Sequence, residues 1–217
     1  MRLLSTKILS QAQQQRITSS GITLCMYDAL TIVPNSFDIP QGDYDAIFTS
    51  QNAAQAYLNN GGDLKGRDVF CVGEKAAMLL SQNGQKVIEI APNSLELGQK
   101  ILKKHKNRDF LYFSGNLRRP ELPQILTANK VSFSEQIAYH TQINNFEFEH
   151  EFDSILFFSP SGVSSYFFNA PTNNPDAICI GQTTAQAAKE FTTNIHVAIH
   201  STVDGVIDAA LKTKISL

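Results

Sequence analysis

The sequence lacks the cysteine and histidine patterns that mark a disulfide framework or a metal site. Only three cysteines occur, at positions 25, 71 and 179, and no two of them form a Cys-x-x-Cys pair. An odd number of widely spaced cysteines predicts neither a disulfide-stabilised domain nor a zinc ribbon. The five histidines show no metal-ligand spacing either. We therefore expect no bound metal ion.

Long apolar runs and an excess of one charge are also absent. No run approaches the ~18 apolar residues that span a bilayer, and the first ten residues lack the apolar stretch of a signal peptide. We expect a cytoplasmic protein without membrane contact. Lysine and arginine number 18 against 20 aspartates and glutamates, a net charge of -2. This balance excludes the broad basic surface of many nucleic-acid-binding proteins, though not a local basic patch, and we expect no nucleic acid as a partner.

The glycine-rich motifs of nucleotide-binding proteins are missing as well. The chain contains neither Gly-x-Gly-x-x-Gly nor the Gly-Lys-Ser/Thr end of a P-loop. A nucleotide-dependent enzyme therefore has little support.

What the sequence does contain is an internal repeat at half its length. Residues 44–48 (Tyr-Asp-Ala-Ile-Phe) return as 152–156 (Phe-Asp-Ser-Ile-Leu). Residues 68–73 (Asp-Val-Phe-Cys-Val-Gly) return as 176–181 (Asp-Ala-Ile-Cys-Ile-Gly), and both offsets are 108 residues. Because 108 is about half of the 217 residues, we interpret the chain as two copies of one structural unit.

Each unit alternates short apolar runs with segments of helical periodicity. This alternation predicts an α/β fold, with parallel sheets covered by helices on both faces. Ten strands exceed the usual single sheet, so we expect two similar domains, each with a five-stranded parallel sheet. The expected strands are 2–5, 22–27, 45–49, 68–72, 86–90, 109–113, 131–138, 153–158, 176–180 and 195–199. The expected helices are 8–19, 51–60, 74–83, 94–104, 119–128, 161–169, 182–191 and 203–212.

Two stretches in equivalent places of the repeat are interpreted as crossings between the domains. They lie near 28–34 and 138–144, and Pro34 cannot continue a central strand. Such crossings allow an interleaved arrangement, and a simple division near residue 108 stays open. The interleaved domains would be 1–31 with 142–217, and 32–141.

Small polar residues fill the loops after five of the expected strands. In open parallel sheets, ligands bind beyond the carboxyl ends of the strands. Each loop leads into a helix, whose free N–H groups and positive dipole end suit an anion. Helix capping alone explains any single loop, but five in matching places predict a ligand cleft between the domains. The candidate binding residues are Thr49, Ser50, Gln51, Asn52, Gly73, Lys75, Ser114, Gly115, Asn116, Arg118, Ser159, Ser161, Gly162, Gln182, Thr183 and Thr184.

Taken in order, these loops resemble the uroporphyrinogen-III synthase family. The most specific pair of stretches is Phe-Phe-Ser-Pro-Ser-Gly at 157–162 and Ile-Gly-Gln-Thr-Thr at 180–184. The other matching stretches are 45–50, Val72-Gly73, 114–119 with Leu122-Pro123, and Ala138-Tyr139-His140-Thr141.

The resemblance implies two similar α/β domains joined by a two-stranded linker, which selects the interleaved arrangement. It implies a hydro-lyase of tetrapyrrole and heme biosynthesis. The reaction would close linear hydroxymethylbilane to uroporphyrinogen III, with loss of water and inversion of ring D. It also implies no cofactor, no metal, a monomer, and a transient contact with the deaminase that forms the bilane.

The same resemblance assigns roles to residues. Tyr139, at the second crossing, matches the family's linker tyrosine and is the expected proton donor. The bilane carries eight carboxylates, so helix ends and hydroxyls would bind it with help from Arg118, Arg119 and Lys75. The family often has a threonine a few residues after the first Val-Gly, and here Glu74 and Lys75 begin that helix instead.

A hypothesis from another class uses the same loops. The chain would then be a non-catalytic, cytoplasmic two-domain protein that binds small anionic ligands at its helix ends. Conversion of the bilane distinguishes the two hypotheses.

Overall fold

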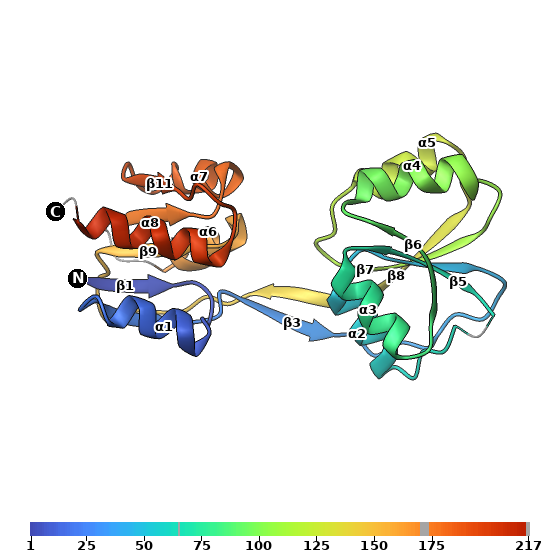
Figure 1. Cartoon of the computed structure of the whole chain (residues 1–217), viewed down its shortest axis with the longest axis horizontal. Helices are drawn as coiled ribbons and strands as arrows, with labels where there is room; N and C mark the ends of the chain where they lie inside the picture. The colour runs from blue at the N-terminus through green and yellow to red at the C-terminus, as the bar shows by residue number, and fades with distance from the viewer. Residues whose placement is uncertain (65, 170–173, 216–217) are drawn as a thin grey trace. The chain divides into compact units, whose positions relative to one another are not determined.

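The structure is a computed structural model that describes residues 1–64, 66–169 and 174–215. The chain divides into two compact units, Met1–Thr31 with Gln142–Leu217 as unit 1, and Ile32–Thr141 as unit 2. Figure 1 shows that both are α/β layers, with a sheet between helices. Among the described residues, no helix has the length and apolar character that a membrane crossing needs.

Unit 1 contains a five-stranded sheet in which all neighbouring strands are parallel. Its order is β11-β10-β9-β1-β2. The strands are β1 (Arg2–Ser5), β2 (Thr23–Met26), β9 (Ser154–Phe157), β10 (Asp176–Cys179) and β11 (Ile195–Val197). The helices are α1 (Gln11–Thr18), α6 (Pro160–Phe167), α7 (Gln182–Ala188) and α8 (Val203–Ile215).

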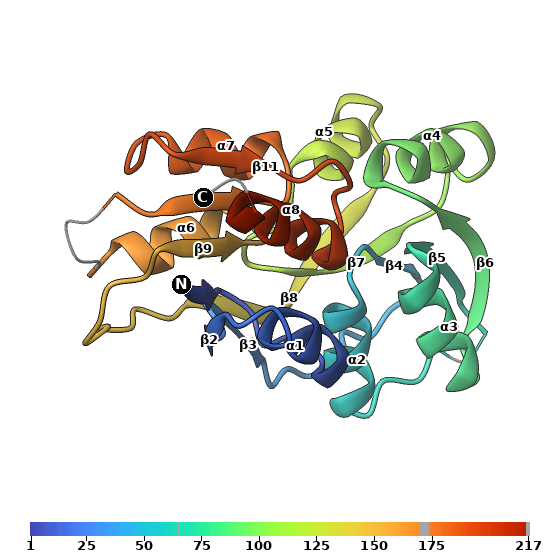
Figure 2. The same ribbon diagram turned by 60° about the vertical axis from the view of Figure 1, so that its left-hand side comes forward.

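The helices of unit 1 cover the two faces of its sheet in pairs. Successive strand residues point to opposite faces, and on β1 Leu3 packs in the cluster of α1 and α8 whereas Leu4 packs in that of α6 and α7. Both leucines are almost completely buried. Figure 2 shows the same pairing, with α1 and α8 together on one side of the sheet. The continuous apolar strands are therefore explained by burial on both faces.

Unit 2 contains a six-stranded sheet with the order β3-β8-β7-β4-β5-β6. The strands are β3 (Leu30–Pro34), β4 (Asp45–Phe48), β5 (Asp68–Val72), β6 (Lys86–Ala91), β7 (Phe110–Gly115) and β8 (Phe133–Ile143). The helices are α2 (Gln51–Asn59), α3 (Glu74–Gln82), α4 (Ser94–Lys104) and α5 (Glu121–Ala128). Phe48 packs toward α2 and α3, and its neighbour Ile47 packs toward α4 and α5.

The sequence repeat corresponds to a repeat of sheet topology. Strands β9, β10 and β11 occupy the places of β4, β5 and β6, while β1 and β2 occupy those of β7 and β8. The predicted α/β class, with parallel sheets flanked by helices, is therefore confirmed.

The prediction of five strands for each sheet is wrong for unit 2. Residues 28–34 were expected to cross between the domains as part of a two-stranded linker outside the sheets, and Leu30–Pro34 form the edge strand β3 beside β8, which adds a sixth strand to this sheet. The Thr31 hydroxyl donates to Asn144 Oδ1 at 3.1 Å, and the Asn35 N–H donates to the Ala138 carbonyl at 2.9 Å. An edge strand needs a partner on one side only, so Pro34 is tolerated at its end. β8 correspondingly extends to Ile143, beyond the expected end at 138.

Candidate functional site

Tyr139 and Ser50 meet at the carboxyl end of the unit 2 sheet. The Tyr139 hydroxyl on β8 donates to Ser50 Oγ at 3.2 Å. Ser50 is also the N-cap of α2, where its Oγ accepts the Asn52 N–H at 3.1 Å. Two residues that the sequence singled out separately therefore share one hydroxyl contact. The Tyr139 ring packs against the apolar cluster below it, which leaves the hydroxyl at the edge of the core.

Gly115 makes room for the Tyr139 ring. A Cβ at position 115 would lie 2.4 Å from Tyr139 Cζ and 2.7 Å from its hydroxyl oxygen. The register of β7 against β8 also shifts between Ser114 and Gly115, which sets Gly115 opposite Tyr139. Glycine is therefore required here by close approach, not by backbone conformation.

Asn116 ties the loop after β7 to the backbone around Tyr139. Its N–H donates to the Tyr139 carbonyl at 3.2 Å, and its Oδ1 accepts the Thr141 N–H at 2.7 Å. Its Nδ2 donates to the Thr141 carbonyl at 3.4 Å. These three contacts fix the loop to the β8 backbone at Tyr139 and Thr141.

A second hydroxyl pair lies at the end of β4. Thr49 Oγ1 and the Tyr112 hydroxyl are 2.7 Å apart. Burial raises the pKa of the Tyr112 phenol, and the Thr49 contact offsets part of that rise. Ser114, two residues further along β7, is 1 % exposed, and no described residue accepts or donates a hydrogen bond at its Oγ.

The cationic side chains at this edge of the sheet differ in their contacts and in their exposure to solvent. The Arg118 guanidinium forms two hydrogen bonds with the Glu135 carboxylate, at 2.6 and 2.8 Å. Arg118 and Glu135 side chains are 27 % and 25 % exposed, and the contact raises the pKa of Arg118. Lys75 and Arg119 are exposed. The expected anion-binding role of Arg118 therefore requires it to leave Glu135 or to bind with it.

The helices after β5 and β10 begin without a capping side chain. Gly73 precedes α3 with a φ of 82°, a left-handed conformation that favours glycine, and Gly181 precedes α7 in extended backbone. Neither can offer a side-chain acceptor to the first N–H groups. Gln51, Asn52, Gln182 and Thr183 are exposed, whereas Thr184 is 3 % exposed.

Ser159 and Gly162 form the corresponding turn after β9 in unit 1. Ser159 is the N-cap of α6, and its Oγ accepts the Gly162 N–H at 3.0 Å. A Cβ on Gly162 would come within 3.2 Å of Thr6 Oγ1, which itself donates to the Leu156 carbonyl. Ser161 is half-buried beside them. Ser50 and Ser159 thus have equivalent capping roles in the two units.

The predicted residues gather at the carboxyl ends of strands, within each unit taken alone. Sequence reasoning missed Tyr112 and Glu135, because each is part of a strand pattern that explains it without a site. It placed Thr141 in the second crossing and gave it no role. The contacts of these residues with Thr49, Arg118 and Asn116 join positions up to 63 residues apart. The sequence contains one signal for these contacts, which is a tyrosine, Tyr112, near the end of an apolar run.

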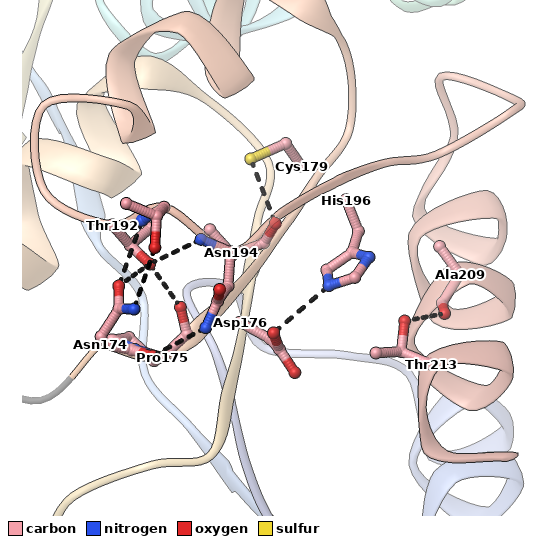
Figure 3. Close-up of polar contacts among 11 residues, drawn as sticks. Asn174, Pro175, Asp176, Cys179, Thr192, Asn194, His196, Ala209 and Thr213 are labelled. Atoms are coloured by element: carbon pink, nitrogen blue, oxygen red, sulfur yellow. Dashed lines mark hydrogen bonds and ion pairs between the residues drawn. The ribbon is translucent and has the colours of Figure 1, made fainter. Parts of the chain in front are cut away.

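A polar network at the opposite, amino ends of β10 and β11 has a structural role. Thr192 Oγ1 donates to Asn174 Oδ1 at 2.6 Å and to the Pro175 carbonyl at 2.8 Å, and His196 Nε2 lies 3.3 Å from Asp176 Oδ1 (Figure 3). These contacts join the segments that enter the two strands. The described residues contain no group of three or more histidine, cysteine, aspartate or glutamate side chains able to hold a metal ion.

Comparison with known proteins gives one consistent result. Residues 13–208 match the family model of uroporphyrinogen-III synthase HemD. A porphyrin biosynthesis protein HemD of Ruminiclostridium josui is 25 % identical over 254 residues, which cover 97 % of this chain and 49 % of that protein. The chain thus spans about half the length of this curated relative.

Two solved structures have the same fold as this chain. Uroporphyrinogen-III synthetase from Helicobacter pylori superposes with a TM-score of 0.75 at 17 % identity, over 98 % of this chain and 100 % of the other. A mutant uroporphyrinogen III synthase from the extremely thermophilic bacterium Thermus thermophilus gives 0.60 at 14 % identity, over 100 % and 99 % of the two chains.

Proposed function

Because the chain belongs to the uroporphyrinogen-III synthase family of hydro-lyases, we propose that it closes linear hydroxymethylbilane to uroporphyrinogen III, with loss of water and inversion of ring D. The match to the family model over most of the chain carries this proposal. The grouping of Tyr139, Ser50 and Asn116 at one sheet edge supports it.

The first step requires a proton for the leaving hydroxyl of ring A. Loss of water leaves an azafulvenium cation, which the substituted α-carbon of ring D attacks to give a spiro intermediate. That intermediate breaks the original bond between ring D and its neighbouring bridge carbon, which gives a second azafulvenium cation. The other α-carbon of ring D attacks this cation and loses its proton, which balances the proton given to the leaving hydroxyl and leaves ring D inverted. We assign the proton donor to Tyr139, whose O–H already points to an oxygen acceptor, Ser50 Oγ. A phenol is a weak proton donor, so its chemical contribution is modest.

Folding the bilane makes the larger contribution to the reaction. Hydroxymethylbilane closes without a catalyst to the type I isomer, so the enzyme must bring the substituted carbon of ring D to the reacting carbon first. Substrate carboxylates would bind the α3 and α7 N-termini and the exposed side chains beside them. Each charge-assisted hydrogen bond contributes ~1.5–3 kcal/mol. The proposed binding residues are the sixteen candidates of the loops, with Lys75 and Arg119 as exposed cations.

The remaining expectations follow from the same family. We propose that the reaction uses no cofactor or metal, that the protein acts as a cytoplasmic monomer, and that it contacts the bilane-forming deaminase transiently. Analytical ultracentrifugation with and without that deaminase tests the last two statements.

The direct test is an assay of product isomers. Purified protein is added to freshly made hydroxymethylbilane, and the oxidised products are separated by chromatography. Type III product above the uncatalysed level supports the proposal. Folded protein that binds the bilane and yields only the type I isomer would instead support a non-catalytic anion-binding protein.

A further inference from the structure

We propose that the outer edge of β2 in unit 1 is a docking site for an extended, basic segment of a partner protein, which adds to the sheet as a sixth strand. This inference is independent of the proposed reaction. It rests on the backbone of β2, on an apolar groove beside it, and on the charge of the groove.

The outer edge of β2 has unpaired backbone groups. β2 is the terminal strand of its sheet, and the only neighbour it has among the described strands is β1. The N–H groups of Thr23 and Tyr27 donate inward, to the carbonyls of Met1 and Ser5, at 3.1 Å each. Because N–H directions alternate along a strand, those of Leu24 and Met26 point outward.

β2 also lacks the features that protect edge strands from pairing. Natural edges commonly have lysine, proline or a bulge, and the β2 sequence is Thr-Leu-Cys-Met, with Thr23 and Cys25 exposed. The corresponding edge of unit 2 differs, since β3 lies beside β8 and ends at Pro34. Of the two equivalent sheet edges, the one in unit 2 is therefore paired with a further strand, and the one in unit 1 is unpaired among the described strands.

An apolar groove of about 390 Å³ runs beside the open edge. Cys25 and Tyr27 form its strand side, and Phe146 and Phe148 form the opposite side. The Tyr27 ring lies 5.1 Å from Phe148 and 6.0 Å from Phe146, and Phe146 remains 54 % exposed. Side chains of an added strand alternate between its two faces, so every second residue would enter this groove.

The acidic side chains of the groove indicate that the bound segment is basic. Glu147, Glu149 and His150 line it, and the described lining residues include no lysine or arginine. An extended segment whose apolar residues enter the groove, and whose basic residues lie beyond its ends beside the carboxylates, would therefore fill the groove and neutralise its rim. A second copy of this chain is disfavoured, because antiparallel pairing of two β2 edges would bring the acidic rims together.

The test uses a defined peptide as the probe. Fluorescein-labelled Lys-Val-Lys-Val-Lys-Val-Lys is titrated with the whole protein, and binding is followed by fluorescence anisotropy. We expect saturable binding that weakens with added salt. Bound peptide should slow the reaction of Cys25 with a thiol reagent, because Cys25 is the exposed cysteine and Cys71 and Cys179 are buried.

Two comparisons separate strand addition from attraction by charge alone. The same peptide with alternate backbone nitrogens methylated keeps its charge but loses the donors that a ladder requires, and it should not bind. The double variant Glu147→Gln/Glu149→Gln should weaken binding about three- to tenfold. The control Glu190→Gln/Asp38→Asn removes the same charge from exposed positions elsewhere and should bind normally.

Each of the remaining outcomes contradicts the inference. Equal binding of the methylated peptide, or an unchanged Cys25 reaction rate at saturation, would exclude strand addition at β2. Absence of binding by the unmodified peptide would exclude a basic extended partner at this edge.

Discussion

The Tyr139 hydroxyl donates to Ser50 Oγ at 3.2 Å, across 89 residues of sequence. Ser50 is fixed in turn by the first turn of α2, through the Asn52 N–H. The proposed proton donor, Tyr139, therefore contacts a residue, Ser50, that also caps the start of α2. This relationship makes Tyr139 the first position to test.

Tyr139→Phe should reduce the rate of ring closure without unfolding the protein. The substitution removes only the hydroxyl, and the ring still packs against the unit 2 core. General acids contribute typically 10²–10⁴-fold, and a phenol belongs to the lower end, so we expect about a hundredfold loss in kcat with little change in KM. Stopped assays of product formation measure this. An unchanged kcat would remove Tyr139 from the catalytic role.

Gly115→Ala should displace the Tyr139 ring. The new Cβ would lie 2.4 Å from Tyr139 Cζ, a distance that requires the ring or the strand to move. Overpacking of this kind costs ~1–3 kcal/mol, and we expect a lower midpoint of urea unfolding together with lower activity. Gly181→Ala is the stability control, since its Cβ would meet only Ser201 Oγ, at 3.6 Å. Wild-type stability and activity of Gly115→Ala would contradict the observed packing.

Glu135→Gln should strengthen substrate binding. The Glu135 carboxylate holds Arg118 through two hydrogen bonds, and the neutral amide would release the guanidinium to a substrate carboxylate. We expect KM to fall a fewfold, about what one partly exposed ion pair contributes, while kcat stays nearly constant. Arg118→Gln should raise KM instead. A higher KM for Glu135→Gln would show that the pair binds substrate as a unit.

Stability should fall in acid through the Asp68 carboxylate. A hydrogen bond from Arg108 at 2.7 Å, and an ion pair with the Lys86 ammonium at 2.6 Å, lower the pKa of Asp68 in the folded state. A lowered folded pKa stabilises the fold fully above the ordinary carboxyl pKa and loses that effect as pH falls through the lowered value.

Arg108→Gln tests this linkage. The free energy of unfolding of the variant should be below that of the wild type at about pH 7, and the difference should shrink toward about pH 2. Arg119→Gln, at an exposed position, serves as the control with no such pH dependence. A difference that is the same at both pH values would exclude the Asp68 contact as its cause.

Much of the fold could be predicted because local signals coincide with element ends. Helix α4 begins and ends where expected, at 94 and 104, since Asn93 caps it and Lys103 and Lys104 suit its last turn. The edge strand β3 has no such local signal, and only the family resemblance implied a strand at this crossing. Its partner β8 lies about a hundred residues later, and Pro34 taken alone indicates a break.

The site was predictable in its residue types but not in its pairings. Repeated polar loops after strands identified Ser50 and Ser159, and both cap helices as well. The Tyr112 hydroxyl contact with Thr49 and the Glu135 contact with Arg118 depend on strand order. Strand order is a property of long-range pairing, which a single sequence does not encode locally.

The isomer composition of the product tests the account most directly. Hydroxymethylbilane is incubated with wild-type protein and with Tyr139→Phe, and the type I and type III uroporphyrinogens are quantified after oxidation. We predict predominantly type III isomer with the wild type and a slower appearance of type III with the variant. Type I isomer alone, from folded wild-type protein and intact substrate, would contradict the proposed function.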